Sequence, residues 1–183
     1  MMDATRRERL QQALWPSGAA RPLGVWVVLD GARDSRIHLA LLESRLEYRC
    51  LFAGPLTREL EMAAPQLVEL LPGHRLTLRL LDEGWGQSWG IFLRIDDPAN
   101  LRPHLRTLLR VQDEDGAKML FRFYDPRVLR VYLPTCTADE LRQMFGPIDS
   151  LLCEGDGGEL IEFRRRNALL HRSALVMPEP AGA

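Results

Sequence analysis

The stretch SWGIFLRIDDPANLRPHLRTLL, residues 88–109, joins a strand to an amphipathic helix. Residues 88–95 form a compact apolar run, which is typical of a strand. Asp97 and Pro98 fit the N-cap and the first turn of the helix that follows. The buried stripe of that helix is expected to consist of Leu101, Leu105, Leu108 and Leu109. A strand followed directly by such a helix predicts a sheet with helices packed against it.

A second junction from strand to helix is predicted in MLFRFYDPRVLRVYLP, residues 119–134. On a strand over residues 119–124, Phe121 and Phe123 point to one side and enter the core. Arg122 then points to the opposite, partly apolar side. Because a cation on such a face needs a partner, we expect Arg122 to pair with a carboxylate, either Asp125 or one on a neighbouring helix.

The helix after this strand has its own start signal. Asp125 is expected to be its N-cap, and Pro126 its first residue. The residues expected to pack this short helix are Val128, Leu129, Tyr132 and Leu133. RNA-binding strands carry a glycine–aromatic pattern that this stretch lacks, so the motif favours a structural role.

The remaining chain alternates between the two patterns. Further strands are expected at residues 25–29, 50–52, 66–71, 150–154 and 159–163, and further helices at 5–15, 37–46, 57–62, 75–84 and 137–145. Thr5–Glu8 and Thr137–Glu140 have capping-box spacing, and Thr57 fits an N-cap. Hairpin turns are predicted at 113–116 and 156–158. The pattern predicts one α/β or α+β domain over residues 1–176 with a mixed β-sheet, and a disordered tail at 177–183.

Composition limits the classes of function. Lys and Arg number 24 against 25 acidic residues, and the pI is about 6.4, so no net charge attracts nucleic acid or an acidic membrane. The apolar runs are too short to span a bilayer, and the N-terminus has no apolar signal core. Three widely spaced cysteines are typical of free thiols in a reducing compartment. A soluble, cytoplasmic protein is expected.

Gly86-Gln87-Ser88-Trp89-Gly90 matches the G-x-S-x-G pattern of serine hydrolases. Asp96 and then His104 or His171 follow in the order of a hydrolase triad. The hydrolase turn, however, needs a strand before the serine and a helix after it, and here the order is reversed. A glycine-shaped loop is therefore favoured, and a small serine hydrolase using Ser88 is the alternative.

No metal or cofactor site is predicted. The four histidines lie tens of residues apart, without spacing that would fix two ligands on one element: His38, His74, His104 and His171. No phosphate-binding loop and no dinucleotide fingerprint is present. We therefore expect no cofactor and no catalysis.

Several stretches together resemble one protein family. They are WVVLDGARDSRI, EYRCLFAG, APQLVELLPG, GWGQSWGIFLRIDDPANLRPHLRTLLRVQDEDG and FRFYDPRVLRVYLPTCTADELRQMFGPI, which lie in order within residues 24–155. The chain thereby resembles the DUF4123 family, the adaptor or effector-chaperone proteins of type VI secretion. FRFYDPR after the Asp-Gly turn is the most specific part of the resemblance.

The resemblance implies a binding protein rather than an enzyme. Such an adaptor holds a cognate toxic effector in the cytoplasm and helps to load it onto the VgrG spike, with or without a PAAR-type tip. Neither nucleic acid nor membrane is implied as a partner. The residues of the signature are interpreted as structural, and they are Phe121, Arg122, Phe123, Asp125, Pro126 and Arg127.

Partner contact is predicted at three tryptophans that core periodicity does not explain. Trp85 and Trp89 lie in the glycine-rich loop, and Trp15 ends the first helix. Aromatic anchors bury a large area at a small entropic cost, which suits a groove for an apolar segment of the effector. Arg94 is expected at the rim of that groove.

Overall fold

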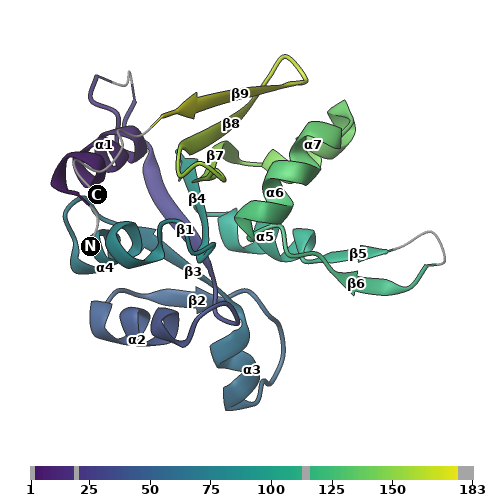
Figure 1. Cartoon of the computed structure of the whole chain (residues 1–183). Helices are drawn as coiled ribbons and strands as arrows, with labels where there is room; N and C mark the ends of the chain where they lie inside the picture. Colours follow the sequence, from purple (N-terminus) through teal and green to yellow (C-terminus); the bar gives the residue numbers. More distant parts are fainter. Residues whose placement is uncertain (1–2, 19–20, 113–115, 177–183) are drawn as a thin grey trace.

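A large antiparallel sheet forms the centre of the molecule (Figure 1). The computed structural model describes residues 3–18, 21–112 and 116–176. In these ranges seven strands form one sheet in the order β2-β3-β1-β4-β7-β8-β9, and each neighbouring pair is antiparallel. The strands are β1 Gly24–Asp30, β2 Tyr48–Cys50, β3 Pro65–Leu70, β4 Gly90–Ile95, β7 Ile148–Glu154, β8 Leu160–Arg166 and β9 Leu169–Leu175. The α+β alternative is confirmed as a single domain, with an antiparallel rather than a mixed sheet.

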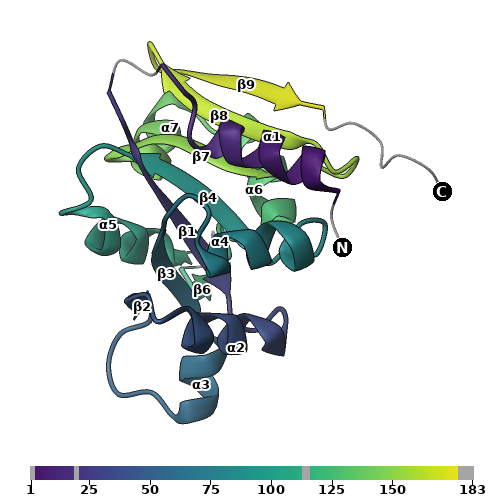
Figure 2. The same ribbon diagram turned by 90° about the vertical axis from the view of Figure 1, so that its left-hand side faces the viewer.

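Helices cover both faces of this sheet, as Figures 1 and 2 show. On one face lie α1 Ala4–Leu14, α2 Ser35–Ser44, α4 Arg75–Arg79 and the π-helical turn η1 Leu80–Gly84. On the other lie α5 Leu101–Leu108, α6 Pro126–Tyr132, the short 3-10 helix η2 Leu133–Thr135 and α7 Ala138–Phe145. The short helix α3 Arg58–Ala63 precedes β3. Because both faces are covered, β1 is apolar from Val25 to Leu29: Val27 packs in one core cluster and Val28 in the other.

A separate two-stranded hairpin projects from the body of the molecule (Figure 1). It consists of β5 Arg110–Gln112 and β6 Lys118–Leu120, which pair antiparallel. This pairing confirms the predicted hairpin, whose turn residues 113–115 lie outside the described residues. The predicted disordered tail, residues 177–183, also lies outside them.

Local start and stop signals are confirmed at several helices. Thr57 accepts a hydrogen bond from the amide of Leu60, and Thr137 and Glu140 form a reciprocal capping box before α7. The predicted turn at 156–158 joins β7 to β8. The three cysteines are free thiols, as expected.

Two predicted helix starts are wrong by a few residues. α5 begins at Leu101, because the carboxylate of Asp97 accepts from the amide of Ala99 (2.9 Å) and closes a separate turn upstream of the helix. α1 begins at Ala4 after Asp3, so Thr5 lies inside the helix and does not cap it. The side chain of Asp97 bonds to the backbone of a separate turn and not to the first turn of α5. This local hydrogen bond explains why α5 begins later than predicted.

The predicted strand over residues 119–124 is also wrong beyond Leu120. The amide of Phe121 still donates to the carbonyl of Leu109 (2.9 Å), and the chain then turns. Phe123 and Tyr124 are both buried, 1% and 2% exposed, and their rings meet edge to face at 5.5 Å. A strand would send adjacent side chains to opposite sides, whereas this turn sends both into the core.

The edge strand β9 was not expected from the sequence. Its side chains are largely exposed on both faces, so LLHRSAL carries neither an apolar run nor a clear alternation. Strand β2 is shifted as well: it covers residues 48–50 rather than 50–52.

Candidate partner-binding site

Arg122 forms an ion pair with Asp30 at the end of β1. Asp30 is 1% exposed, and its carboxylate also accepts from the amide of Ala32 (3.2 Å). Arg122 therefore pairs with a carboxylate, as expected. The predicted partner, Asp125 or a residue of a neighbouring helix, is wrong. The pair ties the turn before α6 to the central strand.

Tyr124 lies beside this ion pair. Burial raises the pKa of Tyr124 to about 12, and the nearby carboxylate of Asp30 adds to this rise. A buried phenol resists ionisation because its anion would lose hydration. At neutral pH Tyr124 is a neutral core residue next to a charged pair.

Asp125 caps α6, as predicted. Its Oδ1 accepts from the amide of Arg127 (3.0 Å), and its Oδ2 pairs with the Arg127 guanidinium (2.6 Å). Burial raises the pKa of Asp125, but the hydrogen bonds from Arg127 outweigh burial and leave the pKa below its usual value. Pro126 is the first residue of the helix. With Phe121 packed on Tyr132 (4.7 Å between ring centres), the signature residues make contacts within the fold.

A buried carboxylate holds the glycine-rich loop between η1 and β4. Glu154, the last residue of β7, accepts from the amides of Gly86 and Ser88 and from the Ser88 hydroxyl. The indole of Trp85 donates to the carbonyl of Gly158 (2.9 Å) in the turn after β7. These bonds satisfy a carboxylate that is only 7% exposed, so the loop and the β7–β8 turn form one unit.

Ser88 has the left-handed backbone of a strained turn, with φ of 56°. The residues that follow in triad order have other contacts: Asp96 pairs with Arg21 (2.6 Å), and His104 contacts the carbonyl of Met144 (3.2 Å). His171 lies on β9 opposite Arg164. Ser88 follows a helical turn and precedes a strand, as the sequence indicated. No observation favours the hydrolase alternative.

Trp85 and Trp89 are core residues rather than exposed anchors. Their exposed fractions are 9% and 3%, and Trp85 packs on Phe92 with 6.1 Å between ring centres. A side chain at Gly84 would come within 2.7 Å of the Trp89 ring, which explains why that position is a glycine. The exposure expected for these two rings is corrected, and their contact with a partner stays a prediction.

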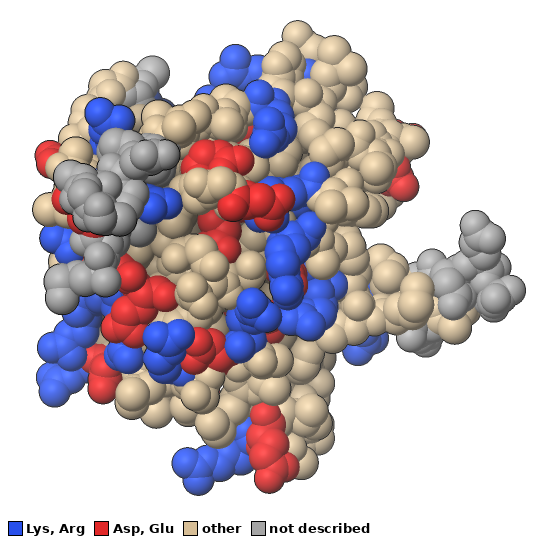
Figure 3. All heavy atoms as spheres, viewed as in Figure 1, with Lys and Arg blue, Asp and Glu red and all other residues tan. Residues whose placement is uncertain are grey.

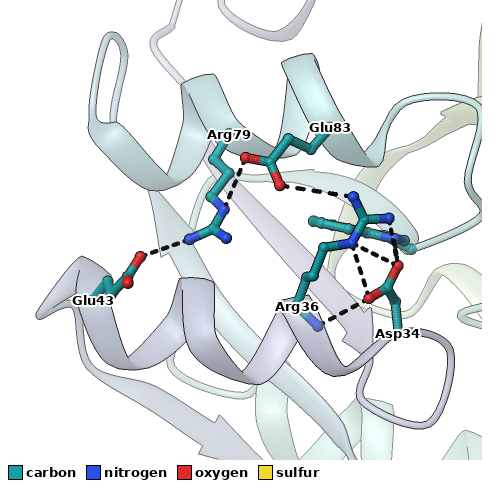
Figure 4. Close-up of polar contacts among 6 residues, drawn as sticks. Asp34, Arg36, Glu43, Arg79 and Glu83 are labelled. Carbon is teal, nitrogen blue, oxygen red and sulfur yellow. Dashed lines mark hydrogen bonds and ion pairs between the residues drawn. The ribbon is translucent and has the colours of Figure 1, made fainter. Parts of the chain in front are cut away.

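A chain of ion pairs joins α2 to α4 and η1 (Figure 4). The Arg36 guanidinium is stacked 5.1 Å from the centre of the Trp89 ring. Hydrogen bonds from Arg36 lower the pKa of Asp34 to about 2. The chain continues from Arg36 to Glu83 (4.0 Å), from Glu83 to Arg79 (3.1 Å) and from Arg79 to Glu43 (2.6 Å). The carboxylates of Glu43 and Glu83 are partly exposed, so these pairs add little stability.

Arg94 does not lie at a rim. It is 3% exposed, donates to the hydroxyl of Ser150 (2.9 Å) and pairs with Glu162. Burial and the repulsion of Arg164 lower the pKa of Arg94 to about 10, so the guanidinium remains charged at neutral pH. The expected rim position is wrong, because a long side chain on β4 lies beneath α1 and bonds to neighbouring strands.

Trp15 is half-buried and lines a surface hollow of about 840 Å³. Arg94 and Arg164 line the same hollow, so the structure brings Trp15 and Arg94 together. Trp85 and Trp89 do not contribute to it. Of the four predicted contact residues, Trp15 and Arg94 line this hollow, whereas Trp85 and Trp89 lie in the core.

A second hollow, of about 750 Å³, lies between the 51–56 loop, α5 and the base of the hairpin. We call it the arginine-lined hollow, and it is defined here by Phe52, Leu56, Arg102, Arg106, Arg110 and Leu120. Sequence reasoning missed it, although three arginines at four-residue spacing were a usable signal.

Charge elsewhere is mixed. Acidic and basic side chains are interspersed over the face shown in Figure 3. Among the described residues, no group of three or more His, Cys, Asp or Glu side chains is arranged to hold a metal ion. The described helices include none that is long and apolar enough to cross a membrane.

A family model described as a domain of unknown function, DUF4123, matches residues 25–143. The match runs from β1 into α7 and includes FRFYDPR. The chain belongs to the DUF4123 family. No curated protein and no solved structure matches the chain.

The two hollows differ in how much of their lining belongs to the region matched by DUF4123. All residues that define the arginine-lined hollow lie within residues 25–143. The hollow at Trp15 is lined by Arg94 and Asp96 within the match and by residues on either side of it, including Trp15 and Arg164. The arginine-lined hollow is thus built by the DUF4123 region itself.

Proposed function

We propose that this DUF4123 protein is a cytoplasmic adaptor of type VI secretion. It binds a cognate toxic effector and assists its loading onto the VgrG spike, with or without a PAAR-type tip. It contributes binding and not catalysis. Nucleic acid and membrane are not its partners.

The main support for this proposal is that charged residues of the DUF4123 signature make their contacts within the fold. Arg122, Asp125 and Arg127 form ion pairs and a helix cap within the fold, which supports a scaffold role for the signature. The same region leaves a large hollow with apolar and basic side chains on its surface. A rigid frame with an open surface suits a protein that holds another protein.

The role of Ser88 agrees with this proposal. Its hydroxyl and amide bind Glu154 and hold a loop, so the residue has a structural function that needs no substrate. Mixed surface charge likewise favours a protein partner over a polyanion.

The test in cells is deletion of the reading frame for this chain. Delivery of the effector encoded beside it should stop, while secretion of the VgrG spike continues, and expression of the chain from a plasmid should restore delivery. Unchanged delivery of each neighbouring effector in the deletion strain would contradict the proposal.

A further inference from the structure

The arginine-lined hollow has an apolar floor that remains partly exposed. Phe52 and Leu56 are half-buried, and Leu120 at the base of the hairpin is 52% exposed. Leu51 and Leu109 close the floor from below and are buried. Apolar side chains of a partner would lose water contact here, which favours binding.

The three arginines beside this floor have no carboxylate partner among the described residues. Arg102 donates to the carbonyl of Cys50 (3.0 and 3.2 Å), a contact that leaves its charge uncompensated. Arg106 and Arg110 form no ion pair within residues 3–18, 21–112 and 116–176. What distinguishes these three arginines is that they line one hollow together, beside an apolar floor.

The three arginines are regularly spaced in the sequence. Arg102 and Arg106 lie four residues apart on α5, and Arg110 follows after four more. The described side chains that line the hollow include no Asp or Glu. A guanidinium binds a carboxylate through two parallel hydrogen bonds, so three guanidinium groups that line one hollow favour a partner with several acidic groups. Carboxylates at every fourth residue of a helix lie together on one face of that helix.

We propose that the arginine-lined hollow binds an amphipathic helix of the effector, with leucine-type side chains on the floor and Asp or Glu facing the arginines. This inference rests on the proposed adaptor function and specifies its surface. The floor is aliphatic apart from Phe52, which suits leucine-type side chains of a protein helix better than the planar bases of an oligonucleotide. The location of the hollow within the DUF4123 region adds support.

The test measures the affinity of the purified chain for the effector that co-purifies with it from co-expression. In the double variant R106E/R110E, the Kd should rise at least tenfold, and the wild-type affinity should fall as salt is raised. Arg9→Glu is the matched control, because Arg9 is exposed on α1 at the opposite face of the sheet. Its Kd should stay within twofold of wild type. Thermal unfolding of each variant confirms that the fold is kept.

A second variant tests the floor. Leu120→Glu places a charge on the apolar side and should weaken binding by a similar factor, whereas Val176→Glu, an exposed apolar position outside the hollow, should not. Reversal of an effector acid to arginine should restore affinity for R106E/R110E.

Other outcomes overturn the inference. Wild-type affinity of both hollow variants would remove this surface while leaving the adaptor function intact. Failure of the wild-type chain to bind any neighbouring effector would remove the proposed function as well. Dissociation of a wild-type dimer by R106E/R110E would assign the hollow to a second copy of the chain, and displacement of the effector by a short oligonucleotide would assign it to nucleic acid.

Discussion

Phe123 and Asp125 lie two residues apart and contribute to stability in different ways. Phe123 is 1% exposed and packs against Tyr124, whereas Asp125 caps α6 through the amide of Arg127. Truncation of a buried Phe to Ala costs about 3–5 kcal/mol because it also leaves a cavity. Loss of an N-cap costs about 1 kcal/mol.

We therefore predict that Phe123→Ala lowers the free energy of unfolding more than Asp125→Ala does. Urea unfolding followed by circular dichroism compares the two variants with wild type. Since Asp125 also pairs with Arg127, Asp125→Asn is a useful control that keeps the size of the side chain. The reverse order of the two midpoints would contradict the packing described for this turn.

Ser88 should not act as a nucleophile. Its hydroxyl bonds to Glu154, and neither Asp96 nor His104 lies beside it in a triad. Incubation with a fluorophosphonate probe should leave the protein unlabelled, as shown by intact-mass spectrometry. Stoichiometric labelling that disappears in Ser88→Ala would contradict this prediction and revive the hydrolase alternative.

At the scale of elements, the loop between η1 and β4 depends on a carboxylate from another strand. Glu154→Gln keeps the shape of the side chain but replaces one carboxylate oxygen by an NH₂ group. In wild type the two oxygens of Glu154 accept from the amides of Gly86 and Ser88, one each. An NH₂ group only donates, so one of the two amides loses its acceptor in the variant. We predict faster hydrogen exchange of these two amides in the variant.

The matched control for this loop is Glu69→Gln, because Glu69 is exposed on β3. Exchange at Gly86 and Ser88 should be unchanged there. Equal exchange rates in wild type and Glu154→Gln would show that the loop is held by other contacts.

The elements also show what sequence can predict. Strands β1, β3 and β4 and the caps of α6 and α7 follow from local patterns, because apolar runs and cap residues act over a few positions. The Asp30–Arg122 pair joins residues 92 positions apart, and no local pattern specifies such a partner. The burial of Trp85 and Trp89 likewise depends on α2 and β7, which are distant in sequence. Edge strand β9 was missed because nearly all of its side chains are exposed, so its sequence shows no alternation of apolar and polar residues.

At the scale of the whole molecule, stability should fall at alkaline pH. The folded pKa of Tyr124 is about 12, above the usual value of 10, so the fold favours the neutral phenol. The stability that this group contributes is fully present below pH 10 and is lost as pH rises toward 12. The slope of unfolding free energy against pH over this window should be smaller in Tyr124→Phe.

Thermal unfolding at several pH values from 9 to 12 measures this slope. Tyr132 also has its pKa raised to about 12, chiefly by burial, so Tyr124→Phe should keep part of the alkaline loss. Identical slopes in wild type and Tyr124→Phe would contradict the burial of this phenol beside Asp30.

We propose that the molecule is a scaffold that holds one effector. Co-expression with each protein encoded beside it, followed by affinity purification and native mass spectrometry, tests this claim most directly. We expect a stable complex of defined stoichiometry with one effector, and none with unrelated toxins. A folded chain that purifies without any of the neighbouring effectors would contradict it.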